Sequence, residues 1–142
     1  MRPVYYFDEV LGYCPVKKYL EQYAPNIKEQ PKQRMRKLKL LDNIVDKIRF
    51  VVDRQGAPTP PISFPLDKDY DYFEIKHRKN KNIVIRIFYF RHHDKIVLLN
   101  ALDKPDNYDT GKENRRIDKQ LQITQGFQNK FKNNPSLYEE YN

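Results

Sequence analysis

Side chains that could stabilise an anion are concentrated in one stretch of the sequence, residues 73–104. Glu74, Lys76 and Arg78 occupy alternate positions in the first apolar run of this stretch. A β-strand points alternate side chains to opposite faces, so this spacing predicts one acid and two bases on one face. The next run is apolar at every position except Arg86. An arginine in a strand covered on both sides needs a partner or a pocket, since an unpaired buried charge costs on the order of several kcal/mol.

The turns around these strands are basic. From Lys76 to His93 the sequence contains six Lys or Arg residues and no Asp or Glu. Such a block attracts polyanions, and RNA is the simplest candidate. The turn residues that we expect to contact RNA are Lys79, Lys81, Arg91 and His92. The same charges are also compatible with the solvated face of an antiparallel sheet, with Arg86 as a structural ion-pair partner. We expect Glu74 to pair with the bases on its own face rather than to act as a general base.

The composition of the chain favours a domain with an acidic partner. Its 142 residues are the usual size of one domain, which we place at residues 1–142 with a loosely ordered tail at residues 133–142. The formal net charge of +8 and the pI near 9.5 point to nucleic acid or an acidic protein. Only 39% of the residues are hydrophobic, so 11 Tyr and 8 Phe must supply much of the core.

Several common functional classes leave no signal in the sequence. Cys14 is the only cysteine, so the chain cannot form an intramolecular disulfide, and we expect a reducing, cytoplasmic compartment. No activating base lies near Cys14 in the sequence, so we interpret it as a small buried residue. We see no signal peptide, no membrane-spanning run and no glycine-rich phosphate loop, and we expect neither a cofactor nor a metal site.

Hydrophobic periodicity and turn residues predict an α+β fold. We expect, in chain order, a short strand, two helices, an irregular proline-rich connection, a meander of three antiparallel strands and a C-terminal helix. These elements are placed at residues 4–7, 15–24, 32–54, 56–65, 73–78, 83–90, 96–102 and 112–132. The second helix carries an apolar stripe at Leu38, Leu41, Val45, Ile48 and Val52. We expect the helices to pack largely against one side of the sheet.

The order of these elements and several short motifs resemble toxins of the RelE/ParE superfamily, and most of all its HigB-like, phage-derived branch. The similarity covers nearly the whole chain, from CPVKKYLEQ in the first helix through KLKLLDNIVDKI in the second. YFEIKHR resembles the family's aromatic-Glu-Leu-Arg strand, and IRIFYF resembles its Arg-hydrophobic-hydrophobic-Tyr strand. IVLLNALDKP resembles the family strand that ends in a Lys-Lys pair. The resemblance implies a RelE-like fold.

The resemblance also implies a catalytic site. Arg86 matches the family's arginine on the central strand, and Lys76 falls where the family carries Arg or Lys. Arg78 lies one repeat further along the face of Lys76, and Lys104 matches the first Lys of the family's pair. Tyr108 lies in the loop where some members supply a tyrosine.

Two positions depart from the family's pattern. Pro105 stands where the second Lys of the pair is usual, and Asn100 stands where a His is frequent. Both departures lie in the same run as Lys104, so they bear directly on whether this chain has the family's activity.

The activity implied by the resemblance is metal-independent cleavage of mRNA, generally on the ribosome, by attack of the ribose 2′-OH on the adjacent phosphorus. Arg86 and Arg78 would clamp the phosphate, and Lys76 would act as the base or as an electrostatic stabiliser. Lys104 would bind phosphate, and Tyr108 would stack on a base or assist proton transfer. A cognate antitoxin protein is the implied partner.

Two other functions fit the same residues. ParE-like members of the superfamily are recognised as gyrase inhibitors, and in that case the cationic face would bind a protein or DNA surface. In a non-catalytic nucleic-acid-binding module, the basic turns would bind RNA or DNA without cutting it.

Overall fold

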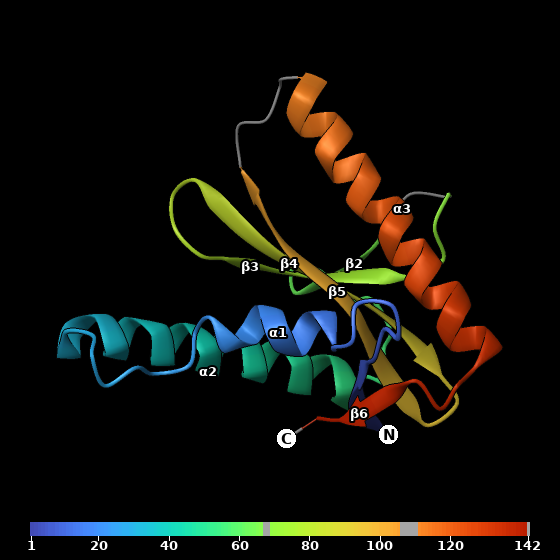
Figure 1. Cartoon of the computed structure of the whole chain (residues 1–142), viewed down its shortest axis with the longest axis horizontal. Coiled ribbons are helices and arrows are strands. Elements are labelled where there is room, and N and C mark those ends of the chain that lie inside the picture. Colours follow the sequence, from blue (N-terminus) through green and yellow to red (C-terminus); the bar gives the residue numbers. More distant parts are fainter. Residues whose placement is uncertain (67–68, 106–110, 142) are drawn as a thin grey trace.

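A computed structural model of the chain describes residues 1–66, 69–105 and 111–141. Within these ranges three helices pack against a six-stranded mixed sheet, which confirms the predicted α+β class (Figure 1). The helices are α1 (Pro15–Glu21), α2 (Pro31–Asp53) and α3 (Gly111–Asn133). The strands are β1 (Arg2–Tyr6), β2 (Ser63–Pro65), β3 (Phe73–Arg78), β4 (Ile83–His92), β5 (Lys95–Pro105) and β6 (Tyr138–Glu140).

The sheet is larger than the three strands expected from the central part of the sequence. Its strand order is β2-β3-β4-β5-β1-β6. β3, β4 and β5 pair antiparallel in chain order, whereas β1 lies parallel to β5 with Val4 opposite Val97. β2 and β6 pair antiparallel with β3 and β1 and close the two edges. β4 and β5 are therefore interior strands.

Helices cover both faces of the sheet, so the expectation that they lie largely on one side is wrong (Figure 1). On one face, Leu20 of α1 and Ile48 of α2 belong to a hydrophobic cluster with Ile87 of β4. On the other face, Phe127 of α3 belongs to a second cluster with Phe88 of β4. This two-sided burial explains the nearly continuous apolar sequences of β4 and β5, which have no solvated face along most of their length.

The predicted apolar stripe of α2 is confirmed at Leu41, Ile48 and Val52, which belong to or pack against a hydrophobic cluster, but is wrong at Leu38. Prolines begin α1 and α2, where a missing backbone N–H costs no hydrogen bond. The buried residues of α2 are Ile44, Ile48 and Val51, whereas Leu38 is 46% exposed. Figure 1 shows the reason, because the N-terminal turns of α2 extend past the sheet. No helix in the described ranges is long and apolar enough to cross a membrane.

Short strands form where the sequence predicted irregular structure. β2 lies inside the proline-rich connection, and β6 lies inside the segment expected to be a loosely ordered tail. Both are edge strands, where Pro65, which has no N–H to donate, is tolerated. β5 also continues to Pro105, so Asp103 and Lys104 lie in the strand rather than in the loop after it.

Gly56 supplies a test of the packing between the end of α2 and the sheet. It has a φ of +82°, and its carbonyl accepts a hydrogen bond from the Tyr89 hydroxyl at 3.2 Å. A Cβ at this position would lie 2.8 Å from Ile96 Cδ1. We expect Gly56→Ala to lower the free energy of unfolding by about 1–3 kcal/mol, measured by urea unfolding, through backbone strain and overpacking.

The control for this substitution is Gly126→Ala in the interior of α3. A Cβ at Gly126 would have no neighbour within 4 Å, so alanine should raise the free energy of unfolding by up to about 1 kcal/mol. Equal unfolding free energies for the two variants would contradict the predicted strain at Gly56.

Candidate functional site

The register of the central strands brings four predicted cationic residues together. Lys76 on β3 lies directly opposite Arg86 on β4. At the next position on the same face, two residues further along β3, Arg78 on β3 and Lys104 on β5 both lie opposite Val84. Directly paired residues point to the same face of a sheet. Lys76, Arg78, Arg86 and Lys104 therefore share one surface, here called the sheet-face cluster.

The sheet-face cluster lies on the α3 side of the sheet. Leu102, which is directly opposite Arg86, belongs to the same hydrophobic cluster as Ile117 of α3. Arg116 of α3 donates from Nη2 to the carbonyl of Asp103 at 3.1 Å. The N-terminal half of α3 thus stands beside the cationic residues, while its C-terminal half covers the apolar part of the same face.

Glu74 is the acidic centre of this surface. Its Oε1 lies 3.5 Å from Lys76 Nζ, and its Oε2 lies 3.5 Å from Arg86 Nη1. The side chains of Glu74 and Arg86 are only 6% and 12% exposed. In the described part of the chain, Glu74 Oε2 and Arg86 Nε are buried without a hydrogen-bond partner. The carboxylate compensates cations that have lost much of their hydration, which confirms its predicted role as an ion-pair partner.

Other groups hold the rest of the cluster in place. The Lys76 ammonium lies over the ring of Phe64 in β2, 4.5 Å from its centroid. Arg78 donates from Nη1 to the carbonyls of Asn80 and Lys81 at 3.3 and 3.2 Å, which braces the β3–β4 turn. Among the described residues, four basic side chains and one carboxylate share this face, a composition that suits an anionic ligand.

Two of the predicted RNA-binding residues lie at the β3–β4 turn. Lys79 points to the opposite face from Arg78, and its Nζ is 3.3 Å from Asp103 Oδ2. Burial alone would lower the pKa of Lys79, but its interactions with Tyr23 and Asp103 raise it. Lys81 is exposed in the turn. The predicted site residue Tyr108 lies outside the described residues.

The other two predicted RNA-binding residues are far from the sheet-face cluster. His92 follows Arg86 by six positions along β4, which corresponds to about 20 Å at about 3.3 Å per residue. Its ring packs 5.1 Å from the ring of Phe131, and burial lowers its pKa. Arg91 is exposed and donates from Nε to the carbonyl of His93 at 3.4 Å. Neither residue belongs to the same surface as Arg86.

His77 lies on the α2 side of the sheet, away from Lys76. Its Nδ1 is buried and has no hydrogen-bond partner among the described residues. Burial, and then the charge of nearby Lys47, lower the pKa of His77 below its usual value. Lys47 itself donates from Nζ to the carbonyl of Lys76 at 3.1 Å. His77 therefore packs as a neutral ring and takes no part in the sheet-face cluster.

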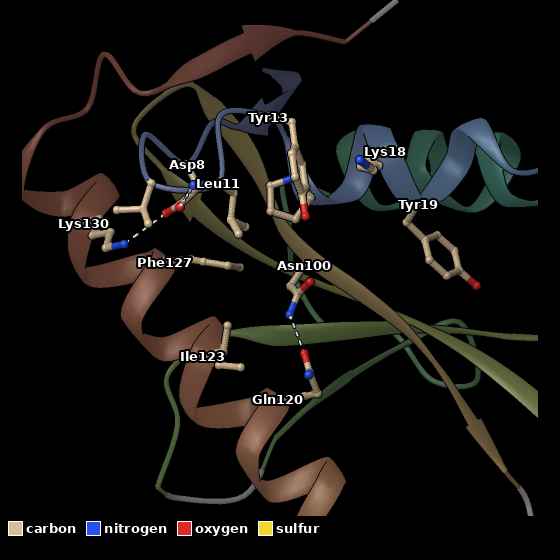
Figure 2. A pocket seen from close by; sticks show the side chains of 12 residues that line it. Asp8, Leu11, Tyr13, Lys18, Tyr19, Asn100, Gln120, Ile123, Phe127 and Lys130 are labelled. Atoms are coloured by element: carbon tan, nitrogen blue, oxygen red, sulfur yellow. Dashed lines mark hydrogen bonds and ion pairs between the residues drawn. The ribbon is translucent and has the colours of Figure 1, made fainter.

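A separate cavity of ≈ 570 Å³ opens between the loop after β1, α1, β5 and α3 (Figure 2). Asn100 lies at its base, where Nδ2 donates to Thr124 Oγ1 at 3.0 Å and Oδ1 accepts from the Ala101 N–H at 3.0 Å. The amide is therefore engaged in joining β5 to α3. Of the described residues that line this cavity, none belongs to the sheet-face cluster.

Asp8 is a buried acid beside this cavity that sequence reasoning missed. It accepts hydrogen bonds from the Tyr6 hydroxyl, the Leu11 N–H and Lys130 Nζ at 2.6, 2.9 and 3.1 Å. Burial alone would raise the pKa of Asp8, but these hydrogen bonds lower it. They tie the loop after β1 to α3 (Figure 2). The available sequence signal was only the presence of Asp8 and Gly12 in one short segment, since both residue types favour turns.

Cys14 and possible groups of metal ligands are the remaining candidates for chemistry among the described residues. Cys14 is 2% exposed, and burial with a hydrogen bond to Glu139 raises the pKa of its thiol to about 12. This confirms the interpretation of Cys14 as a small buried residue. In the ranges that the structure describes, no group of three or more His, Cys, Asp or Glu side chains could hold a metal ion.

Comparison of the chain with protein-family models, with curated proteins and with solved structures gives no match. The function must therefore be inferred from the geometry of this chain.

The contact between Glu74 and Arg86 can be measured with a double-mutant cycle. Glu74→Gln leaves a buried guanidinium without its counter-charge, so we expect it to lower the free energy of unfolding by about 3–5 kcal/mol. Arg86→Met in the same chain should restore part of this loss, with a coupling energy of about 1–3 kcal/mol. The exposed pair Lys132–Asp71, 3.2 Å apart, is the control and should couple by less than about 1 kcal/mol. A coupling for Glu74 and Arg86 no larger than this would contradict the assignment.

The partial burial of His77 predicts a dependence of stability on pH. The pKa of His77 is lower in the folded chain than in the unfolded chain, so the unfolded chain binds more protons as the pH falls below about 6.5. Stability should therefore fall between pH 7.5 and pH 5, and His77→Gln should reduce that fall. Urea unfolding at several pH values measures both slopes. The prediction would be contradicted if the stability of the His77→Gln variant fell with pH as steeply as that of the unsubstituted chain.

Proposed function

We propose that this protein is an RNA-cleaving toxin of a type II toxin–antitoxin system, and that it cuts mRNA at the sheet-face cluster without a metal. The observation that carries the proposal is that Lys76, Arg78, Arg86 and Lys104 share one face of the sheet, where Glu74 pairs with Lys76 and Arg86. Four cations at adjacent cross-strand positions are suited to one phosphate group and its neighbours along a strand.

The chemistry required is stabilisation of negative charge on phosphorus. As the ribose 2′-OH attacks the adjacent phosphorus it loses its proton to water, the P–O5′ bond breaks, and the 5′ oxygen takes up a proton from water, which leaves a 2′,3′-cyclic phosphate. The phosphorane between these steps carries more negative charge on its oxygens than the phosphodiester. Arg86 pairs with Glu74, and its side chain is only 12% exposed. Low exposure reduces screening by water, so its attraction for the charge that develops on phosphorus is stronger. Arg78 and Lys104 lie one cross-strand row further along the face and would contact the same or the next phosphate.

Lys76 is better suited to electrostatic stabilisation than to proton transfer. Its ammonium lies 3.5 Å from the Glu74 carboxylate and over the Phe64 ring, and these two contacts fix its position on the sheet face. The side chain of Glu74 is only 6% exposed and carries two ion pairs, so we assign it to positioning the two cations.

The arrangement of the elements supports a RelE-like origin for this activity. The chain contains a strand, two helices, three consecutive antiparallel strands and a C-terminal helix, as a RelE-like fold would, together with two short edge strands, β2 and β6, that the resemblance does not include. In this proposal the net charge of +8 provides long-range attraction to the ribosome and mRNA, and an acidic antitoxin would neutralise it.

A non-catalytic RNA-binding module is the second candidate. It is favoured by the low exposure of Arg86 and by Pro105, which stands at the end of β5 where the family has a second Lys. A module of this kind would retain RNA affinity and give no cleavage products.

Cleavage can be tested in a cell-free translation reaction, with primer extension to locate cuts in the mRNA. We expect discrete cuts from the unsubstituted chain and a loss of about 100-fold or more in Arg86→Ala, because one charge-stabilising donor typically contributes this much. Arg49→Ala is the control, since Arg49 is exposed on α2 and pairs only weakly with Asp46 at 3.7 Å.

Two outcomes would contradict the proposal. Full cleavage by a folded Arg86→Ala variant would remove Arg86 from the site. Intact mRNA together with normal RNA binding by the unsubstituted chain would favour the non-catalytic module.

A further inference from the structure

A cleft of ≈ 660 Å³ lies on the other side of the β3–β4 turn from the sheet-face cluster. Its volume is in the range of about 300–1,000 Å³ that is usual for ligand sites. It is bounded by the end of α1, the N-terminal half of α2 and the β3–β4 turn. The residues of α2 that line it recur at helical spacing, so one face of that helix forms its wall: Gln33, Arg36, Lys37, Lys39, Leu40 and Asn43.

The positive charge of this cleft is only partly compensated. Lys37 lies 2.9 Å from Glu29, and Lys79 lies 3.3 Å from Asp103. In the described part of the chain, neither Arg36 nor Lys39 forms an ion pair, and both are exposed. The cleft therefore carries two cations that are available to an anionic ligand.

The remaining polar groups of the cleft are amides rather than carboxylates. Gln22, Gln33, Asn43 and Asn80 line it, and Tyr23 lies at its base with 4% of its surface exposed. Amides donate and accept hydrogen bonds, so they can pair with ribose hydroxyls and base edges. Cations together with amides, and no acidic side chain among the described lining residues, match a nucleic-acid strand better than an apolar ligand.

The β3–β4 turn connects this cleft with the sheet-face cluster. Arg78 and Lys79 are consecutive, and their side chains point to opposite faces of β3. Arg78 belongs to the sheet-face cluster, whereas Lys79 and Asn80 line the cleft. A single-stranded RNA that crosses the turn would meet basic side chains on both sides of it.

We propose that the cleft binds the single-stranded RNA that flanks the phosphate held at the sheet-face cluster. The inference rests on the proposed function for the position of that phosphate, but binding at the cleft requires no cleavage. Arg36 would contact phosphate through its planar guanidinium, and Lys39 would act as a point charge. The amides would contact sugars and base edges without strong preference for a sequence.

Fluorescence anisotropy with labelled single-stranded RNA tests this inference, with a dodecanucleotide and a trinucleotide titrated at several salt concentrations. The variant is Arg36→Gln combined with Lys39→Gln. For the dodecanucleotide we expect an affinity about ten-fold lower, and a salt slope smaller by about 1.4, because each phosphate contact on a single strand contributes about 0.7. The trinucleotide is short enough for the sheet-face cluster alone, so its affinity should be unchanged.

The matched control removes the same two charges elsewhere, with Arg49→Gln combined with Lys132→Gln. Both of these residues are exposed and lie outside the cleft. We expect the control to keep the salt slope of the unsubstituted chain. An equal loss in both double variants would overturn the site, because net charge alone would then explain the binding. An oligoglutamate that displaces RNA from the unsubstituted chain but not from the Arg36/Lys39 variant would overturn the RNA assignment in favour of an acidic peptide.

The RNA-binding titration and the mRNA cleavage assay together separate failure of this inference from failure of the proposed function. Loss of dodecanucleotide binding in the Arg36/Lys39 variant, with no mRNA cleavage by any variant, would support the cleft and remove the nuclease. An unchanged salt slope in that variant, with cleavage that depends on Arg86, would overturn the cleft and leave the nuclease in place.

Discussion

The register between β3, β4 and β5 is the constraint on which the rest of the structure depends. It places Lys76 opposite Arg86 and aligns Arg78 with Lys104 across the central strand. A slip of one residue would turn every side chain of a strand to the other face, and Arg86 would then lie in the core beneath α1 and α2. The apolar positions of β4 oppose such a slip, because both of its faces are covered and each face has its own hydrophobic cluster.

The ion pairs within the sheet-face cluster determine which ligands this surface can bind. Glu74 is nearly inaccessible and holds Arg86 and Lys76 from below, so two cations are retained at positions that burial would otherwise disfavour. Among the described residues of this face, Glu74 pairs with two of the four cations, Lys76 and Arg86. The basic side chains that share the face favour an anionic ligand.

The arrangement of helices on both faces creates two cationic surfaces instead of one. α3 crosses the face that carries the sheet-face cluster, and the N-terminal turns of α2 extend past the sheet (Figure 1). One face of α2 forms the wall of a cleft beside the β3–β4 turn. The alternation of Arg78 and Lys79 joins the two surfaces at that turn. The cavity beside Asn100 is of another kind, because its polar groups are engaged in holding α3 and the loop after β1.

The sequence by itself determined the local pattern of this protein: the α+β class, the helix positions, and the shared face of Glu74, Lys76 and Arg78. These follow from backbone periods of two and 3.6 residues, which act over a few neighbouring positions. Tertiary structure alone decided that β1 pairs parallel to β5, that α3 covers the opposite face from α1 and α2, and that His92 lies about 20 Å from Arg86. These features depend on the apolar surface that is buried between segments far apart in the sequence. The order of basic residues along the chain does not determine which of them become neighbours in space.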